Sequence, residues 1–204
     1  MIAIVDYGLG NVIAFANVYK KLNLPVIVVK QAQDLKQATK VILPGVGSFD
    51  NAMQRLEKSG MWQILDEMVL QRHIPVLGVC VGMQMLAHSS QEGKRPGLGW
   101  IDGQVQRFIP AASGNSMRVP HMGWNNLKQL KTSSLLQGID ADARFYFLHS
   151  YYFCCRHSQD IVAVTDYNGE FVCVVNSGNI FGVQFHPEKS HRWGVKLLEN
   201  FGKL

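Results

Sequence analysis

The chain has 204 residues, of which 47% are hydrophobic and 17% charged, a composition typical of a globular protein with a sizeable core. The formal net charge of +5 is spread over short pairs such as Lys20-Lys21, so we expect neither nucleic acid nor a membrane as a partner. No apolar run approaches the roughly 18 residues that span a bilayer, and the N-terminus lacks the basic start of a signal peptide, so we expect a cytoplasmic protein.

The first half of the chain alternates short apolar runs with segments of helical periodicity. Strands are predicted at residues 2–5, 26–29, 41–43 and 74–79. Helices are predicted at residues 11–22, 49–58 and 61–72, the second capped by Ser48. Continuous apolar strands separated by helices indicate a parallel sheet that is covered on both faces.

The second half has the pattern of antiparallel strands followed by one helix. Strands are predicted at residues 100–108, 118–121, 124–127, 144–152, 161–165, 171–175 and 180–185. Turn residues at 168–169 and 177–179 join some of them as hairpins, and residues 191–201 form the last helix. We therefore expect a single α/β domain over residues 1–204, with a mostly parallel sheet and antiparallel additions in its C-terminal half.

One of the four cysteines lies in a turn with the form expected for a nucleophile. Gly78-Val-Cys80-Val-Gly82 follows an apolar strand and precedes a helical pattern that carries Met83 and Leu86. Glycine permits a tight turn from strand to helix, and the helix N-terminus favours the thiolate. The plainer alternative is a buried cysteine beside two glycines that only close a turn. Cys154, Cys155 and Cys173 form no C-x-x-C pair, so no metal site is expected.

A histidine and a carboxylate follow the strand predicted at residues 180–185. Pro187 holds the preceding His186 in an extended conformation, so His186 and Glu188 point to the same side of the chain. The carboxylate can then hold the imidazole in one tautomer, which is the arrangement that activates a thiol. The alternative is a histidine at a strand end with a solvent-facing glutamate.

Six motifs in order give the chain a resemblance to the class I (triad) glutamine amidotransferases along nearly its whole length. They lie at residues 6–11, 43–49, 78–84, 119–125, 145–151 and 182–190. The cysteine turn and His-Pro-Glu are shared across that class. The motifs Pro-Gly-Val-Gly, Pro-His-Met-Gly-Trp-Asn and His-Ser-Tyr are narrower, and they resemble the glutaminase subunit of imidazole glycerol phosphate synthase, an enzyme of histidine biosynthesis.

The resemblance implies a flavodoxin-like doubly wound fold, the hydrolysis of L-glutamine and no cofactor. Cys80 would attack the side-chain amide, His186 would move the proton, and Glu188 would orient the imidazole. The oxyanion hole would come from the backbone N–H of Val81 and, after a rearrangement of residues 44–47, of Val46.

The resemblance also assigns residues to the substrate's amino-acid end. These are Gly45, Gln84, His149, Ser150 and Tyr151. Plainer roles are open for three of them, since Gly45 can serve only to turn the chain, Gln84 can be a surface helix residue, and Tyr151 can belong to the core.

A partner protein is expected because ammonia in neutral water is mostly ammonium, which is a poor nucleophile. The chain has no phosphate loop, dinucleotide fingerprint or metal cluster with which to bind an acceptor itself. The resemblance implies a (β/α)8-barrel cyclase as the partner, contacted through a surface that comprises Asn11, His121, Met122, Trp124, Asn125 and Tyr146. The alternative is a strand with a core tryptophan.

Two departures from the histidine-pathway pattern leave the acceptor open. Val12 follows Asn11, and His191 follows Ser190 where that subunit commonly has glutamine. Both features resemble a branch that supplies ammonia to a sugar amidotransferase of surface-polysaccharide synthesis. A stand-alone hydrolase of γ-glutamyl bonds and a regulatory subunit with a dead site are further alternatives.

Overall fold

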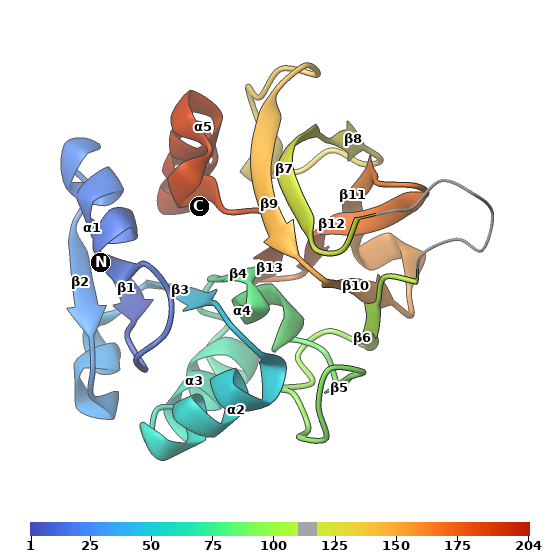
Figure 1. Cartoon of the computed structure of the whole chain (residues 1–204). Helices are drawn as coiled ribbons and strands as arrows, with labels where there is room; N and C mark the ends of the chain where they lie inside the picture. Colours follow the sequence, from blue (N-terminus) through green and yellow to red (C-terminus); the bar gives the residue numbers. More distant parts are fainter. Residues whose placement is uncertain (110–117) are drawn as a thin grey trace.

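The computed structural model describes residues 1–109 and 118–204, in which a large mixed sheet lies between helices (Figure 1). The parallel part of the sheet contains, in spatial order, β2 (Val26–Val29), β1 (Ile2–Val5), β3 (Lys40–Gly45), β4 (Val76–Cys80) and β13 (Ile180–Val183). Their apolar, β-branched runs are buried, except for the half-buried edge strand β2, as a sheet covered on both faces requires.

Antiparallel strands extend the sheet beyond β13. The order continues with β12 (Glu170–Ser177), β10 (Tyr151–Cys155), β6 (Gly103–Arg107) and the short β5 (Ser89–Ser90). The strand β11 (Ile161–Asp166) pairs with both β12 and β8 (Lys128–Gln129). The predicted fold class, a mostly parallel sheet with antiparallel additions in the C-terminal half, is confirmed.

Helices cover both faces of the parallel strands. In Figure 1, α2 (Phe49–Lys58) and α3 (Trp62–Asp66) lie on one side of β3 and β4, while α1 (Val12–Lys21) and α5 (His191–Lys203) contact one another on the other side. Short 3-10 turns occupy residues 32–37, 134–136, 158–160 and 187–189. Among the helices in the described ranges, none combines the length and apolar character needed to cross a membrane.

Two predicted strand boundaries near the centre of the molecule are wrong. Residues 118–121 and 124–127 contribute to one strand, β7 (His121–Asn126), which begins directly after Pro120 because proline has no N–H to donate. The strand predicted at 144–152 is broken at Ser150 into β9 (Arg144–His149) and β10. The break occurs because β9 pairs with β7 in a separate ribbon, whereas β10 belongs to the main sheet.

Two helix predictions also need correction. The helix after Cys80, α4, ends at Gln84, because the carbonyls of Met85, Leu86 and Ala87 accept from the backbone N–H groups of residues 98, 101 and 99 instead of continuing the helix. The helix predicted at 61–72 is α3 followed by a π-helical turn at Glu67–Gln71.

The predicted cap of α2 is also different. Ser48 occupies the N-cap position, but its side chain makes no capping hydrogen bond. The Glu92 carboxylate instead accepts from the backbone N–H of Phe49 at 2.8 Å. A side chain 43 residues away in sequence thus caps this helix.

Close backbone contact at the end of β4 requires glycine. A Cβ on Gly82 would lie 1.9 Å from the Leu43 carbonyl oxygen of β3, and a Cβ on Gly45 would lie 2.5 Å from Gly82 N. Both obstacles are backbone atoms, so no side-chain rearrangement can relieve them.

We predict that Gly82→Ala lowers the free energy of unfolding by about 3 kcal/mol, because the added methyl group must push α4 away from the backbone of β3. Gly178→Ala is the control: Gly178 has φ +57° but open space around it, so only the left-handed backbone opposes the substitution, at about 1 kcal/mol. Urea unfolding measures both. Equal losses would contradict the steric explanation.

Candidate active site

Cys80 ends β4 in a strained backbone conformation. Its φ of 54° and ψ of −113° lie in a region that costs a non-glycine residue about 1–3 kcal/mol. The side chain is 3% exposed and lines a cavity of about 300 Å³ at the carboxyl edge of the sheet. This is the turn that the sequence predicted, but its helix is only four residues long, so the helix dipole acting on the sulfur is small.

His186 and Glu188 lie together as the His-Pro-Glu sequence predicts. Nδ1 of His186 is 2.9 Å from Oε1 of Glu188, and the two side chains are 5% and 2% exposed. Burial lowers the pKa of His186, but hydrogen bonds and charge interactions with Cys80 and Glu188 outweigh burial and raise the pKa to about 10. The imidazole is therefore placed to carry a proton beside the sulfur.

The backbone of His186 is bound to the neighbouring ribbon strand. Its N–H donates to the carbonyl of Tyr146 at 2.8 Å, and the hydroxyl of Ser190 donates to the His186 carbonyl at 2.6 Å. The same hydroxyl accepts from the N–H of Tyr146 at 3.0 Å. These three bonds fix the imidazole-bearing segment to β9.

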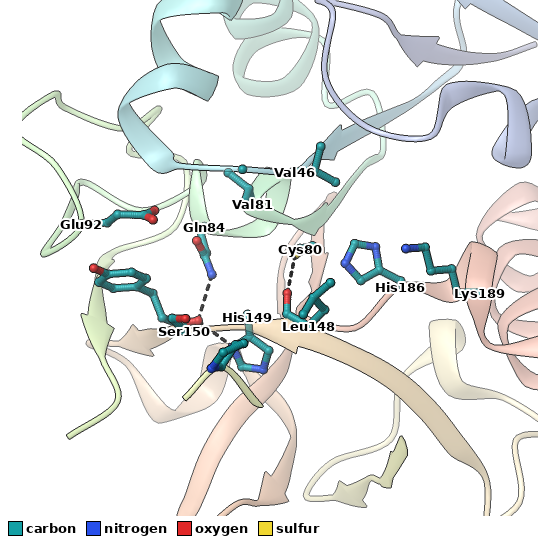
Figure 2. Close-up of a pocket in the computed structure, with 13 residues that line it drawn as sticks. Val46, Cys80, Val81, Gln84, Glu92, Leu148, His149, Ser150, His186 and Lys189 are labelled. Atoms are coloured by element: carbon teal, nitrogen blue, oxygen red, sulfur yellow. Dashed lines mark hydrogen bonds between the residues drawn. The ribbon is translucent and has the colours of Figure 1, made fainter. Parts of the chain in front are cut away.

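Opposite sides of the cavity come from segments far apart in sequence (Figure 2). Val46 and Val81 lie on one side, next to Cys80, and the crossing from β9 to β10 passes along the other. The residues of that crossing which line the cavity are Leu148, His149, Ser150 and Tyr151. Gly45 is not among the lining residues in the described part of the chain; it is buried in β3, against the turn that follows Cys80.

Gln84 is buried rather than on a helix surface. Its side chain is 2% exposed, lines the cavity, and donates to the carbonyl of Tyr151 at 2.9 Å. His149 contacts the same carbonyl through Nδ1 at 2.7 Å, and its Nε2 lies 3.2 Å from Nδ1 of His121. Burial lowers the pKa of His149 to about 3 and that of His121 to about 4, so both rings are neutral at pH 7.

Glu92, Leu148 and Lys189 line the cavity although the sequence analysis assigned them no role. The pKa of Glu92 is raised by burial, partly offset by its hydrogen bond from Phe49 N, and the charge of Asp50 raises it further. Glu92 follows a two-residue strand in an irregular segment, so no local pattern marks it as part of the site.

The residues predicted to form a partner surface, apart from Asn11, lie on two different faces of the β7–β9 ribbon. Met122 is paired with Leu148 and Trp124 with Tyr146 on one face, which we call the outer face. Met122 and Trp124 are 65% and 37% exposed there. His121 and Asn125 alternate to the other face, where His121 is buried in an aromatic cluster and Asn125 donates to the carbonyl of Asp166. Asn11 is exposed and caps α1.

The chain is similar to known proteins along its whole length. The family model described as glutamine amidotransferase class-I matches residues 3–203. Curated relatives named imidazole glycerol phosphate synthase subunit HisH are 55% identical in Bdellovibrio bacteriovorus and 53% identical in Leptospira interrogans, each match covering 100% of both chains. A subunit HisH 2 of Pseudomonas aeruginosa is 44% identical over the same full coverage.

Solved structures with similar folds are more distant in sequence. A GMP synthase subunit from Thermoplasma acidophilum superposes with a TM-score of 0.73 at 18% identity, covering 99% of this chain and 92% of that one. PurLQS from Thermotoga maritima gives 0.72 at 19% identity, covering 98% and 96%. The fold and the family match agree, and the chain belongs to the class-I glutamine amidotransferases, with subunits HisH of imidazole glycerol phosphate synthase as its curated relatives.

Proposed function

We propose that residues 1–204 act as one cytoplasmic domain, the glutaminase subunit of imidazole glycerol phosphate synthase. The subunit hydrolyses L-glutamine to glutamate and ammonia. A (β/α)8-barrel cyclase receives the ammonia and makes imidazole glycerol phosphate and AICAR in histidine biosynthesis. The proposal rests on the interaction of His186 with Cys80 on one side and with Glu188 on the other, beside a cavity of about 300 Å³ that Cys80 and His186 line.

The chemistry follows from the groups at the cavity. The Cys80 thiolate attacks the side-chain amide carbon of glutamine, and the oxyanion is stabilised by the N–H groups of Val81 and, after a peptide rearrangement, of Val46. His186 donates its proton to the amide nitrogen, which leaves as ammonia. His186 then takes a proton from water, which attacks the thioester and releases glutamate and the thiol. Glu188 keeps the imidazole oriented throughout.

The substrate's amino-acid end meets polar groups at the far side of the cavity. The cavity is lined there by Gln84, Ser150 and Tyr151. His149 also lines it, and its Nδ1 is hydrogen-bonded to the Tyr151 carbonyl. Glu92 contributes a carboxylate to the lining of the cavity. Burial raises the pKa of this carboxyl, and a positive charge placed beside it would favour its ionised form. We therefore assign the α-ammonium group of glutamine to Glu92.

The outer face supports transfer of ammonia to a partner. Leu148 belongs to both this face and the cavity lining, and Lys189 of the lining lies 5.7 Å from the ring of Tyr146. The cavity thus borders an apolar surface that would be costly to leave in water. A partner docked there would cover Met122 and Trp124 and would lie next to the site of ammonia release.

The alternative acceptor rests on a sequence departure at a residue beside the outer face. His191 replaces the glutamine that the histidine-pathway pattern commonly has, and its ring stacks on Trp124 with centroids 5.0 Å apart and planes inclined by 6°. This departure alters the proposed docking surface and leaves Cys80, His186 and Glu188 in place. The alternative function that the departure resembles is the supply of ammonia to a sugar amidotransferase in surface-polysaccharide synthesis.

We predict that Glu92→Gln raises the KM for glutamine about tenfold or more, with a smaller effect on kcat, because a charge-assisted hydrogen bond to the ammonium group is lost. The glutamine oxygen can still accept from Phe49 N, so the cap of α2 is preserved. Glu57→Gln, which alters an exposed carboxylate paired with Arg95, is the matched control and leaves KM unchanged. An unchanged KM in Glu92→Gln would remove Glu92 from the substrate site.

The acceptor is tested by mixing the chain with a histidine-pathway cyclase and its ribonucleotide substrate and measuring glutamate release. We expect glutamine hydrolysis to rise on mixing and to be abolished in Cys80→Ala, which still binds the cyclase because the elbow geometry depends on its glycines. If the wild-type chain binds no cyclase and shows no stimulation, the sugar-amidotransferase alternative is favoured. Strong hydrolysis by the chain alone would favour a stand-alone hydrolase.

A further inference from the structure

Gln184 is a fully buried polar residue with no role in the reaction described above. It follows β13 directly, and it is 0% exposed. A buried carboxamide is costly unless its N–H and C=O groups are hydrogen-bonded. Both ends of this carboxamide have partners, Gln84 on one side and Cys80 on the other.

The orientation of the Gln184 carboxamide is determined by a single backbone carbonyl. The Tyr151 backbone oxygen can only accept, so the Gln84 atom that lies 2.9 Å from it is the amide nitrogen. That nitrogen has a second N–H, which donates to Oε1 of Gln184 at 3.1 Å. The remaining end of Gln184 is therefore Nε2, which lies 3.8 Å from the sulfur of Cys80 and donates to it.

The sulfur of Cys80 lies between a donor and an acceptor. Nε2 of Gln184 is the donor, at 3.8 Å. When the sulfur carries a proton, the carbonyl of Leu148, at 3.9 Å, is the acceptor (Figure 2). The donor stabilises the thiolate, since a charged acceptor strengthens a hydrogen bond. The His186 imidazole is the charged partner of the same sulfur, and the Tyr7 hydroxyl is a further titratable group that interacts with it. The Gln184 amide adds a neutral donor to this pair, whereas α4, with only four residues, contributes little dipole.

We infer that Gln184 is a positioning residue for the nucleophile, one that orients the sulfur and stabilises its thiolate form through an amide held in place by Gln84. This inference rests on the proposed function and extends it, because Gln84 also lines the glutamine cavity. The carboxamides of Gln84 and Gln184 thus connect the substrate end of the cavity to the reacting sulfur. No new covalent step is involved. The hydrogen bond from Gln184 is stronger when the sulfur is a thiolate, both as the sulfur attacks the amide and as it leaves the thioester.

The test is the pH dependence of Cys80 alkylation by iodoacetamide in the chain without substrate, followed by peptide mass spectrometry. In Gln184→Leu we expect alkylation at pH 7 to be about tenfold slower and the pH midpoint to rise by about one unit, the change that one lost hydrogen bond to a charged group produces. Gln63→Leu makes the same change at an exposed position of α3 and leaves the profile as in the wild type. An unchanged profile in a folded Gln184→Leu protein would overturn the inference.

A second variant keeps the test decisive if Gln184→Leu does not fold. Gln184→Met retains an unbranched side chain of similar length but has no N–H to donate, so we expect alkylation at pH 7 to be slowed as in Gln184→Leu. Alkylation of Gln184→Met as fast as that of the wild type would reject the role. Because the assay uses no glutamine, its outcome is separate from that of the proposed function, which fails if the wild-type chain with its cyclase releases no glutamate.

Discussion

The strained turn at Cys80 is the constraint on which the rest of the site depends. Its positive φ is maintained because β3 and β4 approach the turn so closely that only glycine fits at Gly45, Gly78 and Gly82. The register that pairs Gly45 with Cys80 brings the segment after β3 next to the sulfur. The core of the parallel sheet thus stabilises a local conformation that is unfavourable by itself, and Val46 and Val81 reach the cavity as a consequence.

The β7–β9 ribbon connects the cavity to the surface. Its inner face carries His121 and His149, whose hydrogen bonds lead through the Tyr151 carbonyl to the two buried glutamines. Its outer face carries exposed apolar side chains, while the backbone of Tyr146 binds His186. A partner docked on the outer face would therefore contact β9, the strand whose Tyr146 carbonyl accepts from the N–H of His186. Docking could change the position of the proposed base through this hydrogen bond.

Local patterns in the sequence were sufficient to locate most strands and helices, though not all of their boundaries, and to find the groups closest to the chemistry. The elbow at Cys80 and the i, i+2 spacing of His186 and Glu188 are short-range features, and the structure brings these residues together as predicted. The alternation along His121–Asn126 also showed that these residues cannot form one surface. Successive side chains of a strand point to opposite faces, so His121 and Met122 lie on different sides of the ribbon. A glutamine within the apolar run before His186 was another missed signal, because a polar residue in a buried strand needs partners.

Other features could not be predicted because they depend on contacts between distant segments. Glu92 reaches the cavity only because it caps α2 across 43 residues of sequence. The break at Ser150 exists because β9 and β10 pair with different strands. The helix after Cys80 is short because the carbonyls of residues 85–87 accept hydrogen bonds from the backbone of residues 98–101. Each outcome is decided by tertiary hydrogen bonds that outweigh local propensity.

Covalent labelling with an electrophilic glutamine analogue, read by mass spectrometry of the peptides, shows whether Cys80 is the nucleophile of a glutamine site. We expect one label per chain, located on Cys80, with Cys154, Cys155 and Cys173 unmodified, and protection by excess L-glutamine but not by L-asparagine. Labelling elsewhere, or labelling of Cys80 that glutamine does not slow, would rule Cys80 out as that nucleophile.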